Sequence, residues 1–273
     1  ALIDSLTRKN GYDLADIAAA HVEAFEGKWG TPVGWGGSTK AAIAKIKAGE
    51  QETFTPGGAG NGPTIKIAPL GIYCCYKTAT TSYGSFTNHF NASLLKKCFG
   101  VTLLTHSDAR CVVAAYCQAR MVIRAMQDEI PDNPAAIAEL FVSDAQYAES
   151  HLNTQWPEDG TLSEKMKALL TPENFSRETG VISAEICTSN SSYIMNSYPL
   201  TAYCVSKYMP FRNFRLAVTM TVNAGADADS NGSMVGAIAG AALGFHAVPS
   251  DLVTGMHAWR EILRVSKKFH VSL

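Results

Sequence analysis

The segment of residues 108–129 constrains the fold more than any other part of this sequence, because it is apolar on almost every face of a helix. A helix that is apolar all round lies inside a protein, with other elements packed against it. Its interior polar side chains then need hydrogen-bond or ion-pair partners from neighbouring elements. These side chains are Arg110, Gln118, Arg120 and Arg124. The segment predicts a central buried helix.

Apolar residues also recur at intervals of three and four along most of the remaining chain, and no run of alternating β-branched residues competes. Asp13 is placed to cap one predicted helix, and Ser38 and Gly49 mark the start and the stop of the next. The pattern therefore predicts an all-α protein. The expected helices are residues 14–25, 38–49, 108–129, 133–151, 162–170, 198–207, 211–222, 233–244 and 252–265, with long loops at 27–37, 50–64 and 185–197.

The composition describes a well-buried globular protein, with 47% hydrophobic and 17% charged residues among 273. No linker or repeat divides the chain, so we expect a single domain over residues 1–273. A net charge of −1 without a basic run argues against a nucleic-acid partner. Seven cysteines without a CxxC pair indicate reduced thiols in a cytoplasmic protein. The apolar run 234–248 is shorter than the roughly 20 residues that span a bilayer, so no membrane partner is expected.

Three oxygen donors, Asp227, Asp229 and Ser230, follow one another within a short turn. Carboxylates and hydroxyls are the hard ligands that Mg²⁺ and Mn²⁺ take, so the turn predicts a metal site. An EF-hand is excluded, because its twelfth position, which should be a bidentate Glu, is Ile238. An acidic helix cap remains the alternative, since Asp and Ser favour helix starts.

A helix with glycines on one face follows this turn, because Gly232, Gly236, Gly240 and Gly244 recur every four residues. Residues four apart lie on the same face of a helix, and glycines there let a neighbouring helix approach closely. We expect this helix to hold the acidic turn against the core.

Two glycine-rich segments are candidates for binding an anionic ligand. Gly34, Gly36 and Gly37 lead through Ser38 into a predicted helix, where free N–H groups and the helix dipole favour an anion. The second segment, 57–64, has a bare backbone that can wrap a phosphate or a sugar edge. Neither matches a Walker A or dinucleotide fingerprint, and each alone is more often a turn.

His106 stands at the start of the predicted central helix and is a candidate for contact with a ligand. A Ser-His-Asp triad is excluded there, since consecutive residues do not face one another. A histidine that merely caps the helix is the alternative.

Together these segments resemble the signatures of the ADP-ribosylglycohydrolase family. Residues 60–62 and 65–71 resemble its Gly-Asn-Gly-Ala-x-Met-Arg-x-Ala-Pro-Leu-Gly signature, residues 105–106 its Thr-His pair, and residues 225–230 its Gly-Gly-Asp-x-Asp-Thr metal motif. Their order and approximate spacing agree across nearly the whole chain. The family includes ADP-ribosylarginine and ADP-ribosylserine hydrolases, dinitrogenase reductase-activating glycohydrolases and jellyfish lens crystallins.

The resemblance implies a single orthogonal all-α bundle and a metal-dependent hydrolase that removes ADP-ribose from a modified side chain or a small acceptor. ADP-ribose or an ADP-ribosylated protein would be the partner. The alternative from a different class is a catalytically inactive member that serves as a binding or structural protein, as the crystallins do.

The resemblance also implies roles for individual residues. Two Mg²⁺ ions, or Mn²⁺, would hold the distal ribose and position a water, with Asp227, Asp229 and Ser230 supplying part of the ligand set. His106 would contact the distal ribose, and the two glycine-rich segments would hold the rest of the ligand. The residues expected to contact ADP-ribose are Gly34, Gly36, Gly37, Ser38, Gly60, Asn61, Gly62, Pro63, Thr64 and His106.

The sequence departs from the family pattern at several points. The N-terminal Gly-Asp-Ala-x-Gly and Thr-Asp-Asp motifs, which carry the other metal ligands and an acidic catalytic group, have no counterpart. Residues 1–12 resemble the helix that follows them, so we expect these groups to lie in a segment before residue 1. Pro63 replaces Ala, Lys66 replaces Arg, and Ser230 replaces Thr.

Overall fold

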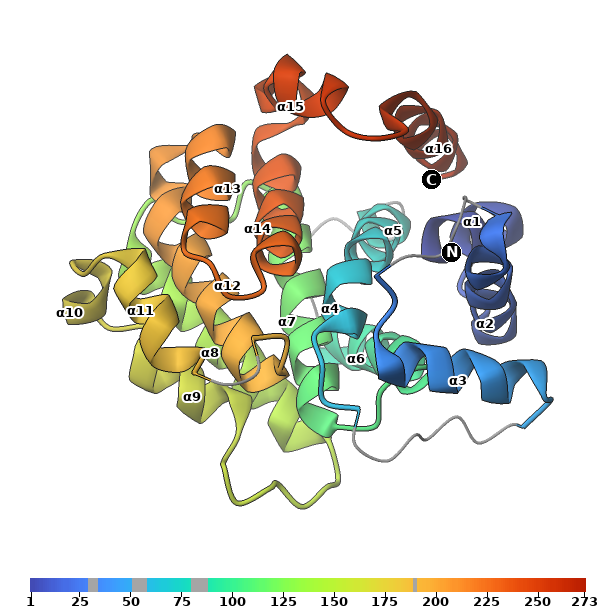
Figure 1. The fold of residues 1–273 in the computed structure, drawn as a ribbon, viewed down its shortest axis with the longest axis horizontal. Coiled ribbons are helices and arrows are strands. Elements are labelled where there is room, and N and C mark those ends of the chain that lie inside the picture. Colours follow the sequence, from blue (N-terminus) through green and yellow to red (C-terminus); the bar gives the residue numbers. More distant parts are fainter. Residues whose placement is uncertain (29–33, 51–57, 80–87, 189–190) are drawn as a thin grey trace.

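The computed structural model describes residues 1–28, 34–50, 58–79, 88–188 and 191–273. Within these ranges the chain forms helices and no strand, so the all-α prediction is confirmed (Figure 1). Two irregular segments meet in one isolated antiparallel bridge, between Gly60 and Tyr193. None of the helices described is long and apolar enough to cross a membrane.

Helix α7 (Ala109–Met126) is the centre of the bundle, as its apolar pattern predicts. Every residue from position 110 to position 123 is buried. The helices that pack most extensively against it are α5 (Ala68–Ala79), α6 (Asn88–Leu103), α8 (Pro134–His151) and α14 (Ala228–Leu243) (Figure 1).

Three buried or partly buried polar side chains on α7 contact partners on neighbouring helices, as such groups usually do. Gln118 donates from Nε2 to the carbonyl of Met234 at 2.9 Å. Arg124 donates to the carboxylate of Asp144 at 2.9 Å, and Arg120 lies 3.7 Å from the same carboxylate. Two arginines of the central helix therefore share one buried acid on α8.

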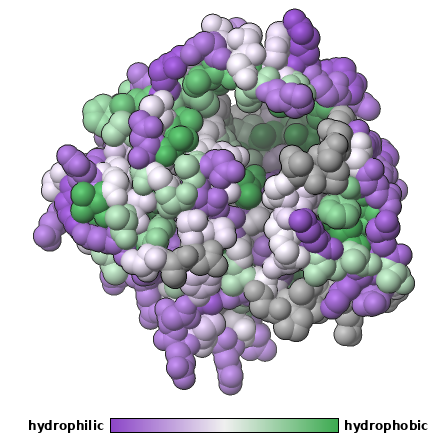
Figure 2. Space-filling model, viewed as in Figure 1, coloured by the Kyte–Doolittle hydropathy of each residue, from purple (hydrophilic) through white to green (hydrophobic). Residues whose placement is uncertain are grey.

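The remaining helices surround this core. They are α1 (Leu2–Lys9), α2 (Leu14–Glu23), η1 (Ala24–Lys28), α3 (Gly37–Lys47), α4 (Gly62–Lys66), α9 (Leu162–Leu169), α10 (Pro172–Phe175), α11 (Thr179–Ile186), α12 (Ile194–Tyr208), η2 (Met209–Phe211), α13 (Phe214–Asn223), η3 (Phe245–Ala247), α15 (Ser250–Thr254) and α16 (Trp259–Ser272). Helix α16 packs against α1, and Figure 2 shows a hollow with apolar side chains beneath the arm formed by α15 and α16.

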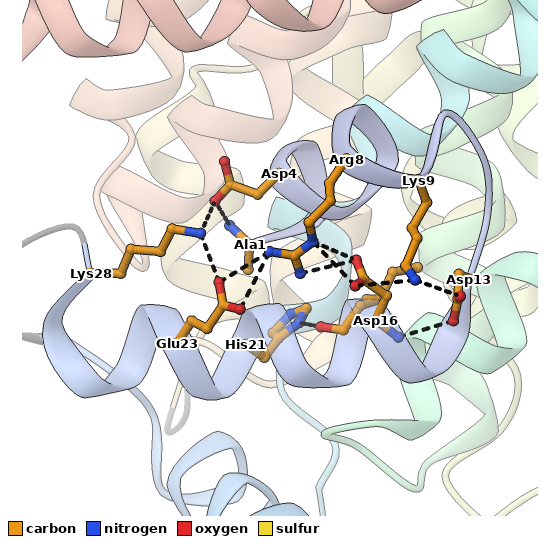
Figure 3. Close-up of polar contacts among 10 residues, drawn as sticks. Ala1, Asp4, Arg8, Lys9, Asp13, Asp16, His21, Glu23 and Lys28 are labelled. Carbon is orange, nitrogen blue, oxygen red and sulfur yellow. Dashed lines mark hydrogen bonds and ion pairs between the residues drawn. The ribbon is translucent and has the colours of Figure 1, made fainter.

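Ion pairs join α1 to α2 and to the η1 turn that follows (Figure 3). Arg8 of α1 contacts Asp16 at 3.0 Å and Glu23 at 3.3 Å. Lys28 contacts Glu23 at 2.7 Å and Asp4 at 3.8 Å. These side chains are at least partly exposed, so water and salt screen each pair and its contribution to stability is small.

The glycine stripe of α14 faces α13, which confirms the close approach expected from its spacing. A Cβ at Gly232 would lie 2.9 Å from a methyl of Val222, and Gly236 and Gly240 also face side chains of α13. Gly244 ends the helix with a left-handed φ of 77°. The helix begins at Ala228 rather than at residue 233, so the predicted metal donors Asp229 and Ser230 lie in its first turn.

The last predicted helix, residues 252–265, is wrong as a single element. The chain instead forms α15 and α16, separated by a break in which Ala258 adopts the left-handed conformation with a φ of 56°. The periodicity does not predict helices α5 and α6, because each contains a glycine and several β-branched or polar residues of low helix propensity. Packing against α7 outweighs that propensity.

Gly71 marks a backbone-to-backbone approach of α5 to α7. A Cβ there would lie 2.9 Å from the carbonyl oxygen and 3.3 Å from the Cα of Ala119. Because backbone atoms cannot swing aside, we expect Gly71→Ala to lower the free energy of unfolding by about 2 kcal/mol through overpacking. Urea unfolding measures the loss. Gly180→Ala is the control, because Gly180 is an exposed helical glycine with nothing within 4 Å of the added carbon. Equal midpoints for the two variants would contradict the prediction.

Candidate functional site

Asn61 joins the glycine-rich loop to the acidic turn, although the two are 166 residues apart in sequence. Its side chain is buried, and Nδ2 donates to Asp227 Oδ2 at 2.6 Å and to Ser197 Oγ at 2.8 Å. Ser197 in turn donates to Asn231 Oδ1 at 2.6 Å. The starts of α4, α12 and α14 therefore meet in one network of polar side chains.

Backbone hydrogen bonds hold the loop that carries Asn61. The N–H of Asn61 donates to the carbonyl of Ser192 at 3.0 Å, and the N–H of Ile194 donates to the carbonyl of Ala59 at 2.9 Å. These bonds form the isolated bridge to the segment before α12. The loop is thus fixed on the side that faces α12.

An ion-pair cluster supports the same segment from α7. Arg110 Nη1 lies 2.6 Å from Asp159, and its Nη2 lies 2.6 Å from Asp108. The Tyr193 hydroxyl donates to Asp159 at 2.5 Å, and the Arg110 guanidinium lies 5.5 Å from the centre of the Tyr193 ring. These contacts give the buried Arg110 its partners and tie the loop at 191–193 to the central helix.

The glycine-rich loop lies against His106. A Cβ would come within 3.1 Å of His106 Cα at Gly58, within 3.4 Å of Nε2 at Gly60 and within 3.0 Å of Cε1 at Gly62. The carbonyl of Gly58 also accepts from the N–H of Asp108 at 3.3 Å. Because any side chain at these positions would meet the imidazole or its backbone, the glycines are what allow the loop to pass so close to the ring.

The start of α3 lies beside this loop, so the two glycine-rich segments meet in space. A Cβ at Gly58 would lie 3.4 Å from Ser38, and one at Gly62 would lie 3.9 Å from Thr39 Oγ1. Gly36 is the N-cap of α3 and makes no side-chain cap bond.

The other predicted ligand-binding residues differ in exposure. Gly34, Gly36 and Gly37 have no described heavy atom within 4 Å of an added Cβ, so their backbone borders open space. Pro63 and Thr64 are buried in α4, where Pro63 occupies the first turn. The Thr64 hydroxyl is buried without a hydrogen-bond partner among the described residues.

The acidic turn presents oxygen donors at the start of α14. Two left-handed residues, Gly225 (φ 80°) and Ala226 (φ 56°), turn the chain into the helix. Asp227 is partly buried and Asp229 is exposed. Asp229 Oδ1 accepts from the N–H of Ser230 at 2.9 Å.

The side chain of Asp227 makes no helix-capping bond and is instead directed to Asn61. A cap alone therefore does not account for this carboxylate. The donor set of two carboxylates and a hydroxyl suits Mg²⁺, which is usually bound by one or two carboxylates and several waters. No group of three or more His, Cys, Asp and Glu side chains placed to hold a metal occurs in the described part of the chain.

Lys66 forms a second polar cluster on the other side of His106. Its Nζ lies 3.2 Å from Thr105 Oγ1 and 3.1 Å from His21 Nε2, and Thr105 Oγ1 lies 2.9 Å from His106 Nδ1. Burial lowers the pKa of Lys66 to about 7. Burial, followed by the charge of Lys66, lowers the pKa of His106 to about 4 and the pKa of His21 to about 3.

The sequence interpretation assigned no role to Ser197, Asn231 or the Lys66 cluster. The available signal was polarity within apolar surroundings, because a buried polar side chain needs a partner. Ser197 comes directly before the apolar segment predicted as the helix 198–207, and Lys66 interrupts an apolar run. That signal identifies the residues but not their partners.

The buried histidines predict a loss of stability in mild acid. The pKa values of His106 and His21 are lowered from 6.5 to about 4 and about 3, so the unfolded chain binds more protons between pH 6.5 and 4. The free energy of unfolding then falls as pH falls through this window, by about 3 kcal/mol between pH 6.5 and 5. Urea unfolding at several pH values measures the slope. The double variant His21→Gln, His106→Gln should show a much flatter dependence, and an unchanged slope would contradict the assignment.

Fold and site define an all-α protein in which a glycine-lined loop meets an acidic turn. The family model for ADP-ribosylglycohydrolase matches residues 1–272, and the chain belongs to that family. Membership supports, at the level of the family, a hydrolase that acts on ADP-ribose conjugates.

A solved structure supports the fold. It is described as an "ADP-ribosylglycohydrolase-related protein complex" and superposes with a TM-score of 0.67 at 19% sequence identity, covering 99% of this chain and 78% of that one. The search of curated proteins found no match.

Proposed function

We propose that this protein is a metal-dependent hydrolase that releases ADP-ribose from a modified side chain or a small acceptor. The observation that carries the proposal is the hydrogen bond from Asn61 to Asp227, because it joins the candidate ligand loop to the candidate metal turn. A ligand held by the loop would lie next to the carboxylates.

The proposed roles follow from position and chemistry. Asp227, Asp229 and Ser230 would hold Mg²⁺ or Mn²⁺, which when bound supplies a Lewis acid and an oriented water. The backbone of residues 60–62 would hold the diphosphate and ribose, and His106 would contact the distal ribose. The open start of α3 would border the adenosine side, where free N–H groups favour an anion.

Asn61 has the clearest positioning role in this proposal. Its amide donates to both Asp227 and Ser197, so the orientation of one Asp227 oxygen is fixed from the ligand loop. The seven cysteines are all unpaired, which supports the further proposal that the protein works in a reducing compartment such as the cytoplasm.

A second candidate is a member that binds ADP-ribose without hydrolysing it. The observation that favours it is that two carboxylates, and no third acidic side chain, are grouped at the turn in the ranges described. Measuring binding and turnover separately distinguishes the two.

Metal and ligand binding test the site directly. We expect calorimetry to detect Mg²⁺ or Mn²⁺ binding, and we expect Asp229→Asn to weaken it at least about tenfold, which is roughly 1.4 kcal/mol. Asp251→Asn is the matched control, since Asp251 is an exposed acid in the first turn of α15. Equal metal affinity in both variants would remove Asp229 from the site.

Release of free ADP-ribose from arginine- and serine-modified proteins, with and without added metal, tests the reaction. Metal-dependent release supports the hydrolase. Tight ADP-ribose binding without release supports the second candidate, and absence of ADP-ribose binding contradicts both.

A further inference from the structure

Three groups form a chain of hydrogen bonds that ends at the ring of His106. Lys66 Nζ contacts Thr105 Oγ1 at 3.2 Å, and Thr105 Oγ1 contacts His106 Nδ1 at 2.9 Å. Thr105 is fully buried and His106 is 5% exposed. The chain therefore runs through the interior, where an unpaired donor or acceptor is costly.

The direction of each hydrogen bond follows from the chemistry of the groups. Below its pKa of about 7, Lys66 is an ammonium, which has donors and no acceptor, so the Thr105 oxygen accepts from it. The Thr105 hydroxyl then has one proton to donate, and the only remaining acceptor it contacts among the described residues is His106 Nδ1. Because a buried hydroxyl proton needs an acceptor, Nδ1 carries no proton. In a neutral imidazole the proton then sits on Nε2.

The tautomer of His21, which also contacts Lys66, is assigned from its hydrogen bonds in the same way. His21 Nδ1 lies 2.7 Å from the carbonyl of Ile17, which only accepts, so Nδ1 carries the proton. His21 Nε2 carries no proton and accepts a hydrogen bond from Lys66 Nζ at 3.1 Å. One lysine thus holds two neighbouring histidines in opposite tautomers, with each hydrogen bond satisfied. Burial and the lysine charge keep both rings neutral near pH 7, since both lower the pKa of each imidazole.

His106 Nε2 faces the glycine-rich loop. It is the closest atom to an added Cβ at Gly60, at 3.4 Å, and lies equally near the Cβ position at Gly62. We propose that Lys66 and Thr105 are positioning residues that hold His106 in its Nε2–H form, so that the ring offers a hydrogen-bond donor to an oxygen of the ligand on this loop. The identity of that ligand as ADP-ribose rests on the proposed function. The tautomer does not depend on it.

The tautomer is measured on the ligand-free protein between the pKa of His106, about 4, and that of Lys66, about 7, where the lysine is charged and the ring is neutral. The measurement is ¹⁵N–¹H correlation of the histidine ring nitrogens, with His106→Gln assigning the signals. We expect the Nε2–H form of His106 in the parent protein. Thr105→Val keeps the shape but removes the hydroxyl, so His106 should shift towards a mixture of tautomers. Thr105→Ser restores the hydroxyl and should restore the parent pattern.

Lys66→Met and Lys66→Arg form a second matched pair. Methionine removes the donor while keeping the length of the side chain, and arginine again only donates. We expect the methionine variant to loosen the tautomer preference and the arginine variant to keep it. If Lys66→Met does not fold, the comparison of Thr105→Val with Thr105→Ser tests the proposal by itself. Nδ1–H in the parent protein would overturn the proposal, and so would an unchanged Nε2–H signal in Thr105→Val.

ADP-ribose binding by calorimetry connects the tautomer to function. The Thr105→Val variant should bind ADP-ribose roughly three- to tenfold more weakly, as expected for loss of one well-oriented hydrogen bond, and Thr105→Ser should bind like the parent. If the parent shows the Nε2–H tautomer but does not bind ADP-ribose, the proposed function fails and the positioning role stands. If ADP-ribose binds equally to all three proteins, His106 does not donate to it.

Discussion

Gly62→Val is expected to weaken ADP-ribose binding by about 100-fold, or roughly 2.7 kcal/mol. Even a single Cβ at this position would lie 3.0 Å from His106 Cε1, and the two further methyl groups of valine need still more space. The imidazole is buried between this loop and Thr105, so it has little room to retreat. Either the ring or the loop must move, and both belong to the proposed ligand site. Calorimetry with ADP-ribose measures the loss.

Gly180→Val controls for the general cost of valine in place of a helical glycine, because Gly180 is exposed and has open space around it. It should bind ADP-ribose as the parent does. A folded Gly62→Val protein with parent-like affinity would place the ligand away from this loop. Far-ultraviolet circular dichroism and the unfolding midpoint establish that both variants are folded.

Asp144→Ala is expected to lower the free energy of unfolding by about 3–5 kcal/mol, the usual cost of removing one partner of a buried ion pair. Asp144 is 5% exposed and faces Arg124 and Arg120 of the central helix. Without the carboxylate, two guanidinium charges would remain close together in the interior. Such a loss is a large fraction of the stability of an ordinary domain.

A second variant at position 144 separates charge from packing, and a variant at position 132 serves as the control. Asp144→Asn keeps the shape and some hydrogen bonds, so it should lose less stability than the alanine variant. Asp132→Ala removes an exposed acid just before α8 and should change stability by about 0.5 kcal/mol or less. If Asp144→Ala unfolds at the same urea concentration as Asp132→Ala, the carboxylate does not neutralise the arginines.

Sequence periodicity predicts the helices that bury one face or all faces. It does not predict helices of weak intrinsic propensity that form because neighbouring helices pack on them. The central helix, its polar residues in need of partners and the glycine face of α14 are all readable locally, because each depends on spacing within one element. Helices α5 and α6 have weak intrinsic propensity and form because α7 packs on them. The break at Ala258 depends on a left-handed residue that no spacing rule requires.

The candidate site is harder to predict from the sequence, because its key contacts join segments that are far apart along the chain. The pairing of Asn61 with Asp227 follows from the packing of α4, α12 and α14, and no local pattern encodes it. Resemblance to the family brought the two segments into one prediction, yet it did not include Ser197 or Asn231. Those residues do no proposed chemistry themselves, and their importance arises only when the helix starts converge on Asn61.

The loop that carries Asn61 is anchored to the segment before α12 by the backbone groups of residues 59, 61, 192 and 194. Such an anchor is indifferent to the side chains at positions 59 and 192, because it uses only N–H and carbonyl groups that every residue except proline provides. Substitution at those two positions can therefore change the side chains on this part of the loop and its partner segment while the loop keeps its place. The path of the backbone is therefore constrained by its own hydrogen bonds, while the side chains at positions 59 and 192 can vary without breaking them.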